Sequence, residues 1–118
     1  MSNSNGKWIF LRVADFWDSA PEDMRESDIK RLEFDIVLGL GTIIEGTNGY
    51  HIIRCGNGGA YGKSGKSCAV VYVMYPKYKV VAYVRTFPDV SYKLTKVEKS
   101  ALKKIKLKID VEIEKNFG

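Results

Sequence analysis

The 118-residue sequence contains few of the residues that mark secreted, metal-binding or membrane proteins. It has only two cysteines, Cys55 and Cys68, and one histidine, His51, and their spacing matches no metal-ligand motif. We therefore expect free thiols, no structural metal and no cofactor. The chain shows no charged and apolar leader, and no apolar run approaches the roughly 20 residues that a membrane span needs. A cytoplasmic protein without a membrane partner is the expectation.

Acidic residues are absent from a long central segment. None occurs from His51 through Arg85, and the cations of this segment are Arg54, Lys63, Lys66, Lys77, Lys79 and Arg85. The whole chain has 19 Lys and Arg against 14 Asp and Glu, which gives a formal net charge of +5. A segment with charge of one sign suits a polyanion such as RNA, and an ordinary solvated basic surface is the alternative.

The hydrophobic fraction of 45% is sufficient for one packed domain, so we expect residues 1–118 to form a single domain of the α+β class. Apolar residues within 7–13 predict a buried opening strand. Ser19, Pro21 and Glu22 resemble a capping box, which predicts a helix that begins there. A second or continued helix is expected from Ser27, closed by glycines at positions 39 and 41.

Strand patterns dominate the second half of the chain. Residues 42–54 are rich in β-branched side chains, and Asn48-Gly49 predicts a turn among them. The runs 68–75 and 78–86 predict an antiparallel hairpin across Pro76-Lys77.

The end of the chain has the pattern of a helix. Thr95 and Glu98 have the spacing of a capping box, so a closing helix should begin there. Strict alternation from Ile105 to Ile113 also fits a strand, so a helix that gives way to a strand is the alternative.

Residues 60–67, Ala-Tyr-Gly-Lys-Ser-Gly-Lys-Ser, resemble a relaxed phosphate-binding loop in which alanine replaces the first glycine. The β-branched run that follows argues against nucleotide binding, because such a loop must lead into a helix. We interpret residues 56–65 instead as a hairpin loop whose glycines allow close approach to a phosphate, with charge from Lys63 and Lys66.

Several side chains are candidates for contacts with RNA. Arg54 and Arg85, on two strands, can reach the same face of an antiparallel sheet. Four tyrosines are available to stack on unpaired bases, although packing within the sheet is the alternative for the second and third; they are Tyr61, Tyr72, Tyr83 and Tyr92. His51 is the default candidate for acid–base work because its ordinary pKa lies near neutrality, and a solvent-facing strand residue without a role is the alternative.

The order of these motifs resembles that of HigB-like members of the RelE toxin superfamily, and the resemblance spans most of the chain. The matching elements are Gly46-Thr47-Asn48-Gly49, the basic strand ending at Arg54, the glycine- and lysine-rich loop, the tyrosine-bearing strand, Tyr83-Val84-Arg85 and Leu94-Thr95.

The resemblance implies a RelE-like fold with an N-terminal strand and helices, an antiparallel sheet and a C-terminal helix. It implies a ribosome-dependent mRNA endonuclease toxin, or mRNA interferase, which a cognate antitoxin neutralises. In that family the ribose 2′-hydroxyl attacks the adjacent phosphate without a metal ion. Carried over by position, the catalytic residues are Arg54, Lys63 and Arg85. The RNA-binding residues are His51, Lys66 and Tyr92.

The sequence departs from the family motifs at three places. Residues 50–52 stand where Leu-Arg-Lys is usual, Lys66 replaces a glycine, and Cys68 stands where an arginine is expected. A cysteine carries no permanent positive charge, so its presence weakens transition-state stabilisation. The alternative function is therefore a non-catalytic RNA- or protein-binding module that retains the toxin fold.

Overall fold

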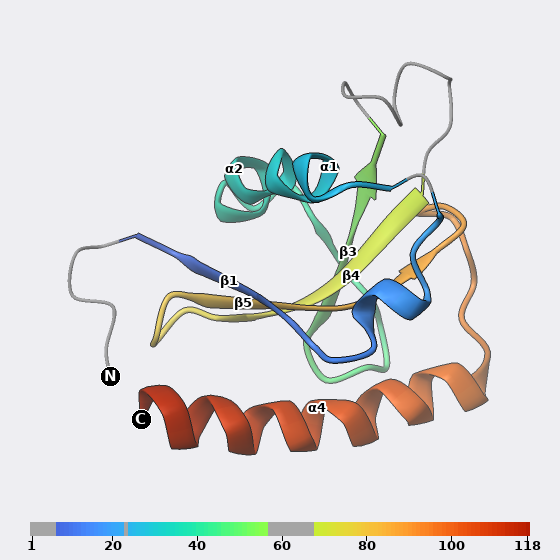
Figure 1. Cartoon of the computed structure of the whole chain (residues 1–118). Coiled ribbons are helices and arrows are strands. Elements are labelled where there is room, and N and C mark those ends of the chain that lie inside the picture. Colours follow the sequence, from blue (N-terminus) through green and yellow to red (C-terminus); the bar gives the residue numbers. More distant parts are fainter. Residues whose placement is uncertain (1–6, 23, 57–67) are drawn as a thin grey trace.

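The computed structural model describes residues 7–22, 24–56 and 68–118, and in these residues the chain forms an α+β fold (Figure 1). The mixed sheet of the described residues has the strand order β1-β5-β4-β3-β2. The strands are β1 (Ile9–Arg12), β2 (Thr42–Ile43), β3 (Tyr50–Cys55), β4 (Cys68–Tyr75) and β5 (Val80–Phe87). The helices are η1 (Phe16–Asp18), a short 3₁₀ turn, α1 (Glu26–Lys30), α2 (Leu32–Val37) and α4 (Lys96–Phe117).

The predicted antiparallel sheet is correct for β2 to β5 and wrong for β1. Strands β3, β4 and β5 pair antiparallel, and the turn at Asn48-Gly49 has both residues at positive φ, as this sequence pair predicts. Strand β1 pairs parallel with β5, from Ile9 opposite Val80 onward. A parallel pair needs a crossover connection, which the helices and strands between β1 and β5 provide. Local patterns predict the opening strand but carry no information about its direction.

Helices cover the two faces of the sheet in different ways (Figure 1). The short helices α1 and α2 lie on one side, here called the α1/α2 face, and α4 crosses the other, here called the α4 face. Because strand side chains alternate between faces, each face buries its own cluster. The α1/α2 cluster includes Phe16, Ile29, Ile36, Val70 and Tyr72. The α4 cluster includes Tyr50, Val71, Leu102, Ile109 and Ile113.

The expected helix at Ser19 is wrong. Ser19 follows the 3₁₀ turn, where its hydroxyl donates to the Phe16 carbonyl at 3.0 Å and accepts the Thr86 backbone N–H at 2.9 Å. This contact with β5 replaces the predicted cap. The first α-helix begins instead after Arg25, whose backbone N–H donates to the Asp28 carboxylate at 2.9 Å. The helix expected from Ser27 is confirmed, as two short segments.

The closing helix is confirmed, and the strand alternative beyond it is wrong. The Glu98 backbone N–H donates to Thr95 Oγ1 at 3.1 Å, and the Thr95 N–H donates to Glu98 at 2.9 Å, so the predicted capping box forms. The helix continues to Phe117. Ile105, Ile109 and Ile113 follow one another at four-residue spacing along the side that packs on the sheet. The intervening apolar residues are exposed on the helix, so the alternating pattern does not correspond to a strand.

Tyrosine hydroxyls of the sheet form hydrogen bonds with α4 at two points along its length. Tyr50 donates to the Leu102 carbonyl at 2.7 Å, and Tyr75 donates to Asp110 at 2.6 Å. Burial raises the pKa of both hydroxyls, so they remain protonated donors at neutral pH. Among the residues that the structure describes, no helix has the length and apolar character required to cross a membrane.

Candidate functional site

Arg54 lies on the α4 face near the end of β3. Its partner in the register is Ala69 on β4, and Ala69 lies opposite Phe87 on β5. Ala69 and Phe87 both belong to the cluster of the α4 face, so the row Arg54, Ala69, Phe87 projects from that face. Arg54 itself is exposed. The structure therefore presents this arginine to solvent beside a small residue and an aromatic ring.

Arg85 lies on the same face, in the neighbouring row. It pairs with Val71, a member of the α4 cluster, and its guanidinium lies 6.0 Å from the centre of the Phe87 ring. Ordinary strand spacing and rise place the Cα atoms of the two arginines roughly 12 Å apart. Each side chain extends several ångströms, so both guanidinium groups can contact one single-stranded backbone. The prediction from the sequence that Arg54 and Arg85 share a face is confirmed.

Tyr92 completes an aromatic pair next to Arg85. Its ring stacks on Phe87, with the centroids 4.8 Å apart and 16° between the planes, and its hydroxyl donates to the two Glu98 oxygens at 3.0 and 2.9 Å. This bond to Glu98 raises the pKa of Tyr92. One face of the ring is thus occupied by Phe87, and a base can stack only on the other.

Glu98 is the carboxylate that contacts Tyr92 next to Arg85. Its bonds from the Thr95 backbone N–H and from the Tyr92 hydroxyl lower its pKa, and the charge of Arg85 lowers it further. The group therefore stays ionised at neutral pH and orients Tyr92. Sequence reasoning identified Glu98 as a helix cap alone and missed Phe87. Strand alternation was the signal that was available, because Phe87 follows Arg85 by two residues and so belongs to the same face.

His51 lies on the opposite face. Its ring stacks on Tyr72, with centroids 5.3 Å apart and 18° between the planes, and its Nδ1 lies 3.2 Å from the Gly49 carbonyl oxygen. Tyr72 belongs to the α1/α2 cluster. The sheet therefore separates His51 from Arg54 and Arg85, and the histidine does not face a phosphate that both arginines contact.

Two of the four candidate tyrosines are core residues. Tyr72 and Tyr83 are fully buried in the α1/α2 cluster, so neither is available to stack on a base. Burial raises the pKa of Tyr72 to about 12. Packing, the alternative reading of these two residues, is correct. Three further candidates, Tyr61, Lys63 and Lys66, lie outside the described residues.

Cys68 is buried on the α1/α2 face. The next residue, Ala69, is the one that projects toward the α4 face between Arg54 and Phe87. An arginine at position 68 would consequently enter the core rather than join Arg54. The departure at Cys68 therefore removes no charge from the α4 face as this chain is folded.

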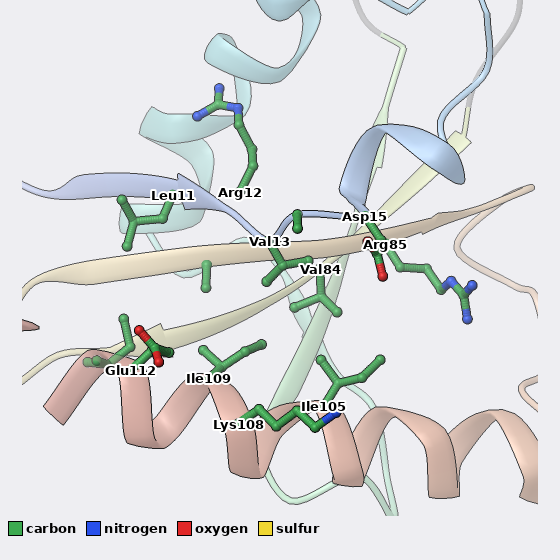
Figure 2. A pocket seen from close by; sticks show the side chains of 13 residues that line it. Leu11, Arg12, Val13, Asp15, Val84, Arg85, Ile105, Lys108, Ile109 and Glu112 are labelled. Atoms are coloured by element: carbon green, nitrogen blue, oxygen red, sulfur yellow. The ribbon is translucent and has the colours of Figure 1, made fainter. Parts of the chain in front are cut away.

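A cavity of about 490 Å³ lies between α4 and the strands β1 and β5 (Figure 2). Its walls are largely apolar, with Leu11, Val84 and Ile109 among them, and Arg85 and Asp15 lie at one end. In Figure 2 the Arg85 side chain points away from the apolar walls. The cavity thus adjoins the cationic face and shares Arg85 with it. Within the described residues, no cluster of three or more His, Cys, Asp or Glu side chains forms a metal site.

Comparisons with known proteins add no assignment. No protein-family model matches the chain, and a search of curated proteins finds no match.

Proposed function

We propose that this protein is a toxin of the RelE/HigB type that binds mRNA on the ribosome through the α4 face and cleaves it without a metal ion. The observation that carries the proposal is the common face of Arg54 and Arg85, next to the Phe87–Tyr92 stack. Two fixed cations and an aromatic surface are what single-stranded RNA needs, because phosphates pair with the cations and bases stack on the ring.

The proposed reaction is attack of a ribose 2′-hydroxyl on the adjacent phosphate. The new O–P bond forms as the bond to the 5′-oxygen breaks, the 2′-hydroxyl loses a proton, and the leaving oxygen gains one. Negative charge develops on the non-bridging oxygens, and preorganised cations stabilise it. Arg54 and Arg85 would perform this role, with Lys63 as the third catalytic cation and Lys66 as a supporting contact.

One structural observation favours the second candidate function, an RNA-binding module that does not cut. His51, the candidate for acid–base work in the sequence, lies on the α1/α2 face. Glu98, the carboxylate that accepts from Tyr92 beside Arg85, has a lowered pKa and is therefore a weak base. Neither His51 nor Glu98 would then serve the arginines as a partner for proton transfer.

The proposed partner protein is a cognate antitoxin. Several large apolar side chains are exposed on α2, on the chain that follows it and on β2, namely Phe34, Val37, Leu38, Leu40 and Ile43. Exposed apolar residues that gather in one segment are typical of protein–protein contacts. This segment lies on the opposite side of the sheet from the proposed RNA surface, so an antitoxin that covers it would leave the arginines uncovered.

Primer extension on mRNA bound to ribosomes tests the proposal. The parent protein should produce discrete cuts, and Arg54→Ala and Arg85→Ala should each reduce cutting by about 100-fold, the usual cost of one missing charge-stabilising donor. Lys77→Ala, in the turn at the far end of β4, is the matched control and should cut like the parent. If the parent binds ribosomes without cutting, the binding module is the correct function; cutting at parental rate by both arginine variants would move the site elsewhere.

A further inference from the structure

The two cysteines of the chain lie directly opposite each other on neighbouring strands. Cys55 ends β3, Cys68 begins β4, and the two pair in the antiparallel register. Both side chains project to the α1/α2 face, where they are 1% and 2% exposed. The Cys55 thiol also approaches the Asp28 carbonyl oxygen of α1, at 3.7 Å.

The register gives these residues the spacing of a disulfide. Residues directly opposite in an antiparallel pair have Cα atoms about 4.5 to 5.5 Å apart, and disulfides span Cα separations of about 4.4 to 6.8 Å. Both side chains belong to one buried cluster, so the two sulfurs lie on the same side of the sheet in the same register row. The Cys68 side chain lowers the pKa of Cys55 by hydrogen bonding, which favours the thiolate that attacks a disulfide.

We propose that Cys55 and Cys68 are an oxidisable pair that forms an intramolecular cross-strand disulfide with a low-molecular-weight disulfide of the glutathione class. The Cys55 thiolate attacks one sulfur of the oxidant and releases one small thiolate, which leaves a mixed disulfide on Cys55. The Cys68 thiol then attacks the Cys55 sulfur of the mixed disulfide and releases the second small thiol. The protein loses two electrons and two protons, and the oxidant gains both.

The position of the pair at the strand ends explains how an oxidant reaches buried sulfurs. Strand ends open more readily than strand centres, and only this terminal pair must separate. Once formed, the bond closes a loop of 14 residues, because 68 − 55 + 1 = 14. A loop of this size restricts the unfolded chain, so the oxidised protein should melt roughly 10 °C higher than the reduced one.

Mass spectrometry of the purified full chain tests the proposal. After incubation with oxidised glutathione and alkylation of remaining thiols, the parent should lose about 2 Da, resist alkylation and stay monomeric. A peptide map should join the segments that contain Cys55 and Cys68. Stable glutathione adducts on one or both cysteines, or a disulfide between two molecules, would overturn it.

Two serine variants give a second measurement. Cys55→Ser and Cys68→Ser are close in size to the parent residue, and each should accept at most one glutathione without the rise in Tm. If a variant does not fold, the melting temperatures of the oxidised and reduced parent still decide the matter. An unchanged Tm in a fully bridged parent would contradict the loop argument. The experiment involves no RNA, so its outcome is independent of the proposed function.

Discussion

Neutralising the two arginines of the α4 face should change both the affinity for RNA and its dependence on salt. Each phosphate contact on a single strand contributes about 0.7 to the slope of log K against log salt. Arg54→Ala and Arg85→Ala should therefore each lower the slope by about 0.7, and the double variant by about 1.4. A rise from about 50 to 200 mM salt then weakens the parent roughly 7-fold more than the double variant.

The structure also determines how much RNA affinity each variant should lose and whether the two losses add. A cation and a phosphate about 4 Å apart at an exposed surface attract each other by about 1 kcal/mol, which corresponds to roughly 5-fold in affinity. The arginines lie roughly 12 Å apart across β4, beyond the range at which two sites usually couple. The double variant should consequently bind roughly 30-fold more weakly at low salt, close to the product of the single effects.

Fluorescence anisotropy with a labelled single-stranded oligoribonucleotide measures both quantities across a salt series. Lys77→Ala removes one exposed cation at the opposite end of the sheet, so it keeps the net charge of a single variant and controls for general electrostatics. Arg54 is exposed, so its removal should change the unfolding free energy by no more than about 0.5 kcal/mol. A double variant with the parental slope, or a Lys77 variant with the same loss, would refute the assignment of the surface.

Three further experiments test the fold and the proposed function. Induced expression in a bacterium should arrest growth, and normal growth with accumulation of folded protein would oppose the toxin assignment. Cys68→Arg should lower the unfolding free energy by about 3 kcal/mol or more, because a charge enters the core, and it should not increase cleavage; a thermal melt and the primer-extension assay check both points. Stability should fall above pH 10, because burial raises the folded-state pKa of Tyr72 to about 12 while the unfolded value stays near 10. The neutral side chain stabilises fully below pH 10, and the loss approaches about 1.4 kcal/mol per pH unit between the two values, which urea unfolding at pH 8 and pH 11 measures.

Elements with strong local patterns could be predicted from the sequence, and elements that depend on distant contacts could not. The turn at Asn48-Gly49 and the cap at Thr95 form because their side chains and backbone act within a few residues. Ser19 has an equally good local pattern, yet its hydroxyl contacts the Thr86 backbone, 67 positions away. The parallel pairing of β1 with β5 is likewise a long-range choice that the opening run does not encode.

The strand positions of the candidate site residues could be predicted from the sequence, but their arrangement on the two faces could be predicted only in part. Regular alternation from Tyr83 would place Arg85 on the α1/α2 face, and the register shift between Val71 and Tyr72 instead brings it opposite Val71 on the α4 face. The shared face of Arg54 and Arg85 therefore required the structure. His51 is three positions from Arg54, an odd separation, so a regular strand places it on the opposite face. Its chemistry suggested a common site that the strand geometry does not allow. Which face each helix covers has no local signal, so the burial of Tyr72 and Tyr83 required the structure.

The separation of the two faces limits the chemistry that the arginines can support. Tyr92 and Glu98 lie near Arg85 on the α4 face, and their mutual bond raises the pKa of the tyrosine while the carboxylate has a lowered pKa. Neither group therefore exchanges a proton readily at neutral pH. Cleavage on this face would therefore rest on charge stabilisation by the cations. Because Arg54 and Arg85 would serve binding under both proposed functions, RNA affinity tests the location of the site, whereas cleavage tests its chemistry.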